Sequence, residues 1–340
     1  MKTFFQIAFI FVFASCSSRL PIAQHRNNIR IPVGMGPEDF VLDTLSSSSP
    51  RLLVSCHQRR KTEAQYSEIC EVNLSNNSFK ILKRLNEPNN MVFNPHGIDL
   101  VKNLKGELLL YCVSHNSPKK EHSIIVYKVF SDHLEFKEKM DSPLLVSPND
   151  VTASCSGEVF VTNDAHKHGN TLEQFLKLKK SNVVHYNPEN QKWNVAANRF
   201  CYSNGIAVHN CPIDFVLLST TRSNKLYKLQ NTSDNKDIYL PKTIAKLKGL
   251  DNITFINDNE ILVTAHLHQY ALIKHSINSK NLSPTVVYRV NISTGEYKAV
   301  YSNDGSDISG GSTALYYNGS LYISQIFDPF ILKCDAPDLK

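Results

Sequence analysis

The sequence lacks several features that would indicate other kinds of protein. After the N-terminal segment it has no run of about 18 apolar residues, which excludes a later transmembrane helix. No two cysteines have C-x-x-C spacing, so a zinc site or a redox motif has little support. Long helical periodicity is also scarce, and residues 171–180 are the one good helix candidate.

The charge distribution argues against a nucleic-acid-binding protein. The net charge of +6 is small for 340 residues, and the densest basic stretches, 59–61 and 177–180, contain no interleaved aromatic residues. Nucleic-acid-binding domains concentrate basic side chains in a patch or stripe. We therefore expect no nucleic-acid partner.

The first 15 residues are predicted to be a signal peptide. Lys2 precedes an apolar segment at residues 4–14, which is too short to span a bilayer. Residues 13–17 resemble a bacterial lipoprotein cleavage box, which predicts Cys16 as a lipid-bearing first mature residue at a membrane surface. The alternative is a simple secretory signal. We expect an exported protein, lipid-anchored in the bacterial envelope or otherwise secreted, with a tether at 16–30 and one domain at 31–340.

Export would permit disulfides. If Cys16 carries a lipid, seven of the eight cysteines remain, and an odd number leaves at least one unpaired. Cys56 with Cys70, or Cys201 with Cys211, could bridge adjacent strands, and the sequence leaves the connectivity open.

A repeat organises the chain. Small polar or acidic residues precede short apolar segments at positions 38, 96, 149, 204, 251 and 311, which are 58, 53, 55, 47 and 60 residues apart. After each start come an apolar segment, a polar turn and a second apolar segment. A four-stranded unit recurring at about 40–50 residues is typical of a propeller blade. The sequence therefore predicts an all-β fold, a six-bladed β-propeller, with the repeated polar residues facing a central channel.

The repeated polar residues would bring oxygen donors together at the axis. They are Glu38, Asp39, Asn149, Asp150, Asn204, Asp251 and Asn252. Carboxylate and amide oxygens in sets of roughly six to eight suit calcium, and converging carboxylates would repel one another without a cation. A single Asn-Asp pair is usually only a turn, but several pairs in blade register favour a calcium-containing channel.

These segments resemble the serum paraoxonase/arylesterase family, whose members are six-bladed propellers and calcium-dependent lactonases. Residues 93–98 (Phe-Asn-Pro-His-Gly-Ile) are similar to the family's motif. Other segments follow in the family's order and spacing, at 36–39, 111–115, 144–151, 162–164, 203–206, 251–253 and 311–313. The resemblance extends from about Gly36 to Cys334.

The resemblance implies two calcium ions in the channel. The catalytic ion would be held by Glu38, Asn149, Asn204, Asp251 and Asn252. The structural ion would take Asp39, Asp150 and the backbone carbonyl of Ile98.

The family's histidine pair maps onto His96 and His115, and a third family histidine maps onto His266. We expect His96 to take a proton from the attacking water and His115 to orient it, while calcium polarises the lactone carbonyl. Asp251 is a rival general base. The other predicted pocket residues are Tyr202 and Asp164.

The sequence also departs from the family. The family joins a cysteine before the Glu-Asp pair to one at the C-terminus, but only Cys334 fits, so ring closure would rest on strand pairing or Cys334 would have another partner. The insertion at 171–180 is shorter and more basic than the family's membrane-facing helix, so docking to lipoprotein particles is not carried over. Residues 56–60 are unlike the family's pocket wall, which leaves the substrate preference open.

Our leading hypothesis is a calcium-dependent hydrolase of lactones and aryl esters. A non-enzymatic, calcium-stabilised binding propeller is the alternative from another class, but it would not require the two histidines beside the calcium ligands. A sugar lactonase similar to gluconolactonase, with a single divalent metal, would not need Asp39 and Asp150 as a second site.

Overall fold

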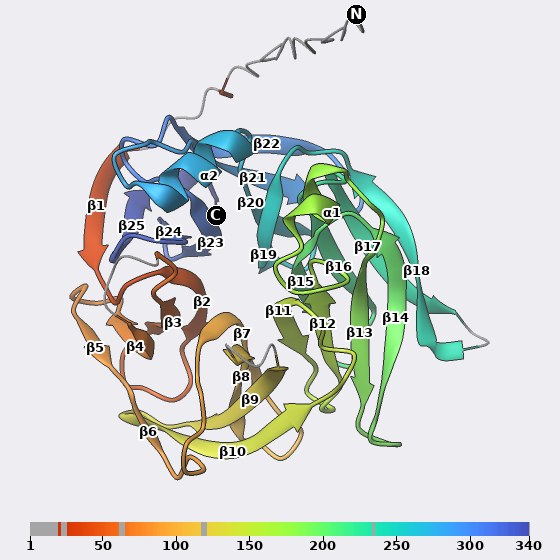
Figure 1. Ribbon diagram of the computed structural model, residues 1–340. Helices are drawn as coiled ribbons and strands as arrows, with labels where there is room; N and C mark the ends of the chain where they lie inside the picture. Colours follow the sequence, from red (N-terminus) through yellow and green to blue (C-terminus); the bar gives the residue numbers. More distant parts are fainter. Residues whose placement is uncertain (1–19, 22–25, 61–64, 117–120, 233–234, 340) are drawn as a thin grey trace, which may run out of the picture.

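Figure 1 shows six small sheets arranged in a ring, which confirms the predicted all-β, six-bladed propeller. The computed structural model describes residues 20–21, 26–60, 65–116, 121–232 and 235–339. The predicted signal peptide and Cys16 lie outside these residues. Within them, no helix has the length and apolar character that a membrane span requires.

Each blade is a sheet of four antiparallel strands, and blade 2 has a fifth, parallel edge strand. Blade 1 contains β2 (Pro37–Asp43), β3 (Arg51–His57), β4 (Ser67–Asn73) and β5 (Phe79–Ile81). Blade 2 contains β7 (Pro95–Lys102), β8 (Leu108–Asn116), β9 (Glu121–Val129), β10 (His133–Asp141) and the edge strand β6 (Lys83–Leu85). Blade 3 contains β11 (Pro148–Ala153), β12 (Val159–Asn163), β13 (Ser181–Asn187) and β14 (Lys192–Phe200).

The second half of the ring repeats the pattern. Blade 4 contains β15 (Ser203–His209), β16 (Phe215–Thr220), β17 (Lys225–Thr232) and β18 (Asn235–Ala245). Blade 5 contains β19 (Leu250–Asn257), β20 (Glu260–Ala265), β21 (Thr285–Asn291) and β22 (Tyr297–Asn303). Blade 6 contains β23 (Gly311–Tyr317), β24 (Ser320–Gln325), β25 (Phe330–Asp335) and β1 (Arg26–Pro32). All six repeat starts predicted from the sequence lie in the first strand of a blade.

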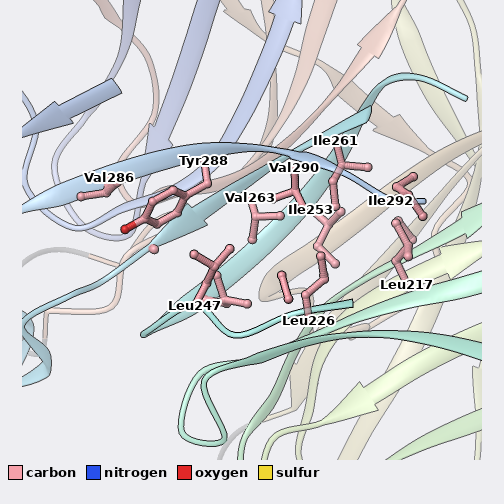
Figure 2. Packing of buried hydrophobic residues seen from close by; sticks show 14 of the residues in the cluster. Leu217, Leu226, Leu247, Ile253, Ile261, Val263, Val286, Tyr288, Val290 and Ile292 are labelled. Atoms are coloured by element: carbon pink, nitrogen blue, oxygen red, sulfur yellow. The ribbon is translucent and has the colours of Figure 1, made fainter. Parts of the chain in front are cut away.

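Apolar side chains fill the space between neighbouring blades. Figure 2 shows the cluster between blades 4 and 5, in which Leu217 and Leu226 pack with Ile253, Val263 and Val290. The middle strands are apolar on both faces because each sheet is covered on both sides. In β16, for example, Leu217 belongs to this cluster whereas its two neighbours pack towards blade 3.

The ring closes by strand pairing. Strand β1 pairs antiparallel with β25 and forms the outer edge of blade 6. Residues 26–30, assigned to a tether from the sequence, are part of this strand, so the propeller begins before residue 31. Cys334, on β25, is a buried free thiol.

The predicted helix at 171–180 is shorter than expected, and one of the disulfide pairings that the sequence left open does not form. Helix α1 (Thr171–Phe175) ends well before residue 180, and Lys177 has a positive φ of 52° that a helix cannot continue through. The disulfide joins Cys155 to Cys211, so Cys201 does not pair with Cys211 and is a buried free thiol.

The structure also shows two more free cysteines and two short helices that were not predicted. Cys56 and Cys70, the other proposed disulfide partners, are also free and buried. A second helix, α2 (Gln269–Ile277), and a short 3-10 helix, η1 (Pro337–Leu339), were not predicted.

Candidate active site

A β-bulge at the start of every innermost strand positions the repeated polar residues. One extra residue interrupts the pairing of the first and second strands, at Pro37/Asp39, Pro95/Ile98, Pro148/Val151, Ser203/Ile206, Leu250/Ile253 and Gly311/Ala314. A bulge breaks the alternation of side chains and re-aims them. Both members of a pair such as Asn149–Asp150 are therefore buried at the channel.

Two glycines allow neighbouring innermost strands to approach each other at this level. A Cβ on Gly97 would lie 2.5 Å from Cα of Asp150, and a Cβ on Gly205 would lie 2.6 Å from Cα of Asn252. Any side chain at either position would push the next strand away. The His-Gly and Asn-Gly sequences thus combine a functional side chain with the space that the next blade needs.

The predicted site residues divide between the two ends of the channel. A pocket of about 210 Å³ at one end is lined by eight of them, namely Glu38, His96, Asn149, Asp164, Tyr202, Asn204, Asp251 and His266. A pocket of about 570 Å³ is lined by Asp39, Ile98, Asp150 and Asn252, together with later residues of the same strands, and so lies towards the opposite end. His115 lines neither pocket.

Four of the five side chains predicted to hold the catalytic calcium present an unpartnered oxygen. Oε2 of Glu38 and Oδ1 of Asn149, Asn204 and Asn252 are buried and have no hydrogen-bond partner among the described residues. The amide orientation of Asn204 is set because its Nδ2 donates to Oγ1 of Thr221 at 2.8 Å. Leaving one buried acceptor unpaired costs about 1–3 kcal/mol. Glu38, Asn149 and Asn204 line the smaller pocket, and Nδ2 of Asn252 donates to Oε1 of Glu38 at 3.2 Å. The four unpartnered oxygens therefore form a suitable ligand set for a hard cation.

The carboxylates of Asp39 and Asp150, unlike these oxygens, have hydrogen-bond partners in neighbouring blades. Oδ2 of Asp39 accepts a hydrogen bond from the amide of Ile98 in the next blade, and Oδ2 of Asp150 accepts one from the amide of Ile206, both at 2.8 Å. Burial raises the pKa of Asp39 and of Asp150 well above the ordinary range, and the negative charge of Asp39 raises the pKa of Asp150 further. These carboxylates link blades and repel each other across the channel.

The two predicted histidines form a direct pair. Nδ1 of His96 lies 2.7 Å from Nε2 of His115, and Nε2 of His96 lies 3.7 Å from Oε2 of Glu38. Burial lowers the pKa of His96 well below its ordinary value, and the positive charge of Arg59 lowers it further. His96 is therefore neutral at working pH and sits beside the unpartnered carboxylate oxygen, where it can accept a proton.

His266 contacts the site through Asp251. Nε2 of His266 lies 2.7 Å from Oδ2 of Asp251, and because an ionised carboxylate can only accept, the imidazole donates. The hydroxyl of Ser312 lies 3.0 Å from the same oxygen and 2.6 Å from Oε1 of Glu38, so its single proton bridges the two carboxylates. Asp251 is thus held in place by two donors, which leaves its other oxygen for a ligand.

The remaining predicted residues form the pocket wall. Burial raises the pKa of Asp164 to about 6, although its carboxylate accepts a hydrogen bond from Ser147 at 2.5 Å. Burial also raises the pKa of Tyr202 well above the ordinary range, so its hydroxyl stays protonated. Together they provide donors and acceptors at the side of the pocket.

Sequence reasoning missed Arg59. Its guanidinium lines the pocket, where Nη1 donates to the backbone carbonyls of Gly36 and His57 at 3.1 and 3.0 Å. Nη2 is buried and has no hydrogen-bond partner among the described residues. The charge of Arg59 lowers the pKa of Glu38, which burial raises. The family resemblance places residues 56–60 at the pocket wall, but the composition shows Arg59 only as part of a short basic stretch, and no motif marked it as a site residue.

A ring of hydroxyl groups was also missed, although the sequence carries its signal. Each second strand has an apolar residue followed by serine or threonine, at 54–55, 113–114, 161–162, 218–219, 263–264 and 323–324. Three of these hydroxyls donate across the blade boundary to a carbonyl of the next innermost strand. They are Thr162 to Asn204 at 2.7 Å, Ser219 to Asp251 at 2.5 Å and Ser324 to Glu38 at 2.7 Å. The backbone of Asn204, Asp251 and Glu38 is thereby fixed by the preceding blade.

Comparison with known proteins places this geometry in a family. The family model for arylesterases matches residues 51–335. Human serum paraoxonase/lactonase 3 is 28% identical over 244 residues, covering 69% of this chain and 67% of that protein. Rat serum paraoxonase/arylesterase 1 is 27% identical over 256 residues, covering 72% and 68%.

Similar solved structures support the fold alone. A luciferin-regenerating enzyme has a TM-score of 0.59 at 9% identity, covering 91% of this chain and 95% of that one. A gluconolactonase from Xanthomonas campestris has a TM-score of 0.53 at 10% identity, covering 93% and 99%. The family match extends over most of the described propeller, and this chain belongs to the arylesterase family.

Proposed function

We propose that this protein is a calcium-dependent hydrolase of lactones and aryl esters. The observation that carries the proposal is the group of four unpartnered oxygens beside the His96–His115 pair. Membership of the arylesterase family supports the same reaction class, and the relatives named above are a lactonase and an arylesterase.

The donor set fits calcium. It contains the carboxylates of Glu38 and Asp251 and the amide oxygens of Asn149, Asn204 and Asn252, with no sulfur or imidazole. Calcium held there would supply a Lewis acid that polarises the substrate carbonyl and stabilises the developing negative charge.

The chain's own groups account for substrate placement and proton transfer. Nε2 of His96 accepts the proton of the water that attacks the carbonyl carbon, and later returns it to the leaving alkoxide or phenolate oxygen. His115 orients the ring by its contact with Nδ1 of His96. The open Nη2 of Arg59 can bind an oxygen of the substrate.

A second, structural calcium between Asp39 and Asp150 is part of the proposal. The mutual repulsion of these carboxylates supports it, since a cation between them would offset the repulsion. Their hydrogen bonds to backbone amides do not conflict with this, because each carboxylate oxygen has two lone pairs.

The test is hydrolysis of a panel of γ- and δ-lactones of increasing acyl length, and of phenyl acetate, by purified protein. We expect activity that a calcium chelator abolishes and added calcium restores. Activity that survives complete removal of calcium would contradict the mechanism. If His96→Gln retains full activity, the general base is Asp251.

The number of metal ions per chain distinguishes the proposed hydrolase from the alternative functions. Two calcium ions per chain are expected by elemental analysis, whereas a single-metal sugar lactonase would hold one. A calcium-loaded protein with no activity on any lactone or ester would instead favour the binding propeller. Export and a lipid on Cys16 are a separate proposal, tested by mass spectrometry of the mature N-terminus.

A further inference from the structure

Three histidines from separate segments meet behind the proposed active site. His115 lies on β8, His122 on β9, and His168 in the connection between β12 and α1. One ring nitrogen from each lies within 4.8 Å of the others. The ring centroids of His122 and His168 are 4.6 Å apart, and those of His115 and His168 are 5.3 Å apart.

The cluster is both buried and reachable. His122 is 5% exposed, and its Nε2 has no hydrogen-bond partner among the described residues. His168 is exposed at the surface, and both residues line a pocket of about 600 Å³. Its charged lining is balanced, with Glu121 and Asp141 beside Lys139 and Lys167. A cation can therefore enter from solvent and reach a buried imidazole.

We propose that His115, His122 and His168 form a binding site for a divalent transition metal, represented by Zn²⁺. Three imidazoles suit zinc, copper or nickel and not calcium, which takes oxygen ligands. Zn–N bonds of about 2.0–2.1 Å at a tetrahedral angle place two ligand nitrogens about 3.4 Å apart. Nδ1 of His115 and Nδ1 of His122 are already 3.0 Å apart. Small ring movements would complete the site.

Occupation of this site would change the catalytic pair, a consequence that rests on the proposed function. Nε2 of His115 faces His96, so Nδ1 is its nitrogen for a metal. A neutral, metal-bound His115 must carry its proton on Nε2 and donate it to Nδ1 of His96. A neutral His96 then carries its own proton on Nε2, the nitrogen that has to accept one from water. Zinc would thus inhibit hydrolysis without touching the calcium ligands.

The experiment uses tag-free, full-length protein in excess calcium, titrated with Zn²⁺ in a calorimeter and with Co²⁺ followed by visible absorption. The matched variants are His168→Gln and His166→Gln, which change two exposed histidines of one loop, only the first of which belongs to the cluster. We expect the wild type and His166→Gln to bind one Zn²⁺ and to give tetrahedral Co²⁺ bands. We expect His168→Gln to bind at least about 10–100-fold more weakly.

Hydrolysis of a lactone is measured in the same samples. We expect zinc to inhibit the wild type and His166→Gln at the concentrations that saturate the calorimetric site, and His168→Gln only at proportionally higher zinc. Equal zinc affinity in His168→Gln, or no binding by the wild type, would overturn the site. Binding without inhibition would overturn the coupling to His96. A protein that binds zinc but hydrolyses nothing would refute the proposed function and leave the metal site supported.

Discussion

The two ends of the channel use adjacent residues of the same bulges for opposite purposes. On the active-site side, Glu38, Asn149 and Asn204 present oxygens that nothing in the described chain satisfies. On the other side, Asp39 and Asp150 accept hydrogen bonds from the amides of neighbouring blades. Unsatisfied groups cost stability and provide binding capacity, whereas satisfied groups hold the ring together. The comparison shows that adjacent residues of one strand can differ completely, one with an unpartnered oxygen and the next with a hydrogen bond to a neighbouring blade.

Glu38→Gln should have the largest effect, on activity alone. Losing a carboxylate ligand should lower kcat/KM by on the order of 10³-fold, as removal of a group that stabilises transition-state charge does. Stability without calcium should not fall, because the glutamine oxygen can still accept from Ser312 and a buried carboxylate with a raised pKa is removed. Steady-state kinetics and thermal unfolding in chelator check both parts. A clear loss of stability in chelator would contradict the view that Glu38 serves binding and does not hold the ring together.

Removing the disulfide should have the opposite effect, lowering stability while leaving activity unchanged. Cys155 and Cys211 line the pocket away from the active site and join blades 3 and 4 across a loop of 56 residues. We expect the double variant Cys155→Ser/Cys211→Ser to lose about 3 kcal/mol of unfolding free energy, with kcat/KM unchanged at 25 °C. Denaturant titrations with and without reductant provide the control, since reductant should destabilise the wild type and leave the double variant unaffected.

The hydroxyl ring allows a smaller, matched test. Thr162→Val removes the donor to the carbonyl of Asn204 and the acceptor for the amide of Asp150, and should cost about 1–3 kcal/mol. Thr264 occupies the equivalent place on β20, but its hydroxyl is buried without a partner among the described residues. Thr264→Val should therefore be neutral or stabilising. Equal costs for the two variants, measured by urea unfolding, would show that the inter-blade bond contributes nothing.

Arg59→Met should raise KM, because Nη2 no longer binds the substrate, and should also produce a smaller, separate effect, a shift of the pH–rate profile. His96 must be neutral to act as a base, so activity falls as pH drops through its pKa. That pKa is lowered first by burial and then by Arg59. Removing Arg59 should raise it and move the acidic limb of kcat/KM, measured at saturating calcium, to higher pH. An acidic limb that stays in place would assign the limiting ionisation to another group.

The sequence predicted the blade starts because repeated polar residues before apolar segments survive as a linear pattern. It did not predict which member of each pair stays unsatisfied, because that depends on amides contributed by another blade. The disulfide was within reach, since the separation of 56 between Cys155 and Cys211 is close to one blade repeat. Pairing cysteines by proximity in sequence, as with Cys201 and Cys211, overlooked equivalent turns in neighbouring blades.

The histidine cluster could not be predicted. His122 and His168 fall outside every motif. The pairing of β8 with β9 places His122 directly opposite His115 within blade 2, and the packing of blade 3 against blade 2 brings His168 to them. Helix α2 was missed because it is a single short insertion, too short for periodicity to stand out.

The pairing of β1 with β25 has a consequence for how the propeller is made. The backbone of residue 26 pairs with that of residue 335, so the sheet of blade 6 assembles only after β25 has been synthesised. The other five blades can form earlier, but blade 6 requires two segments about 300 residues apart in the sequence, and such long-range pairing slows folding. Deleting β1 or β25 would have the same effect, because either change leaves blade 6 incomplete with an unpaired strand edge, which promotes intermolecular aggregation.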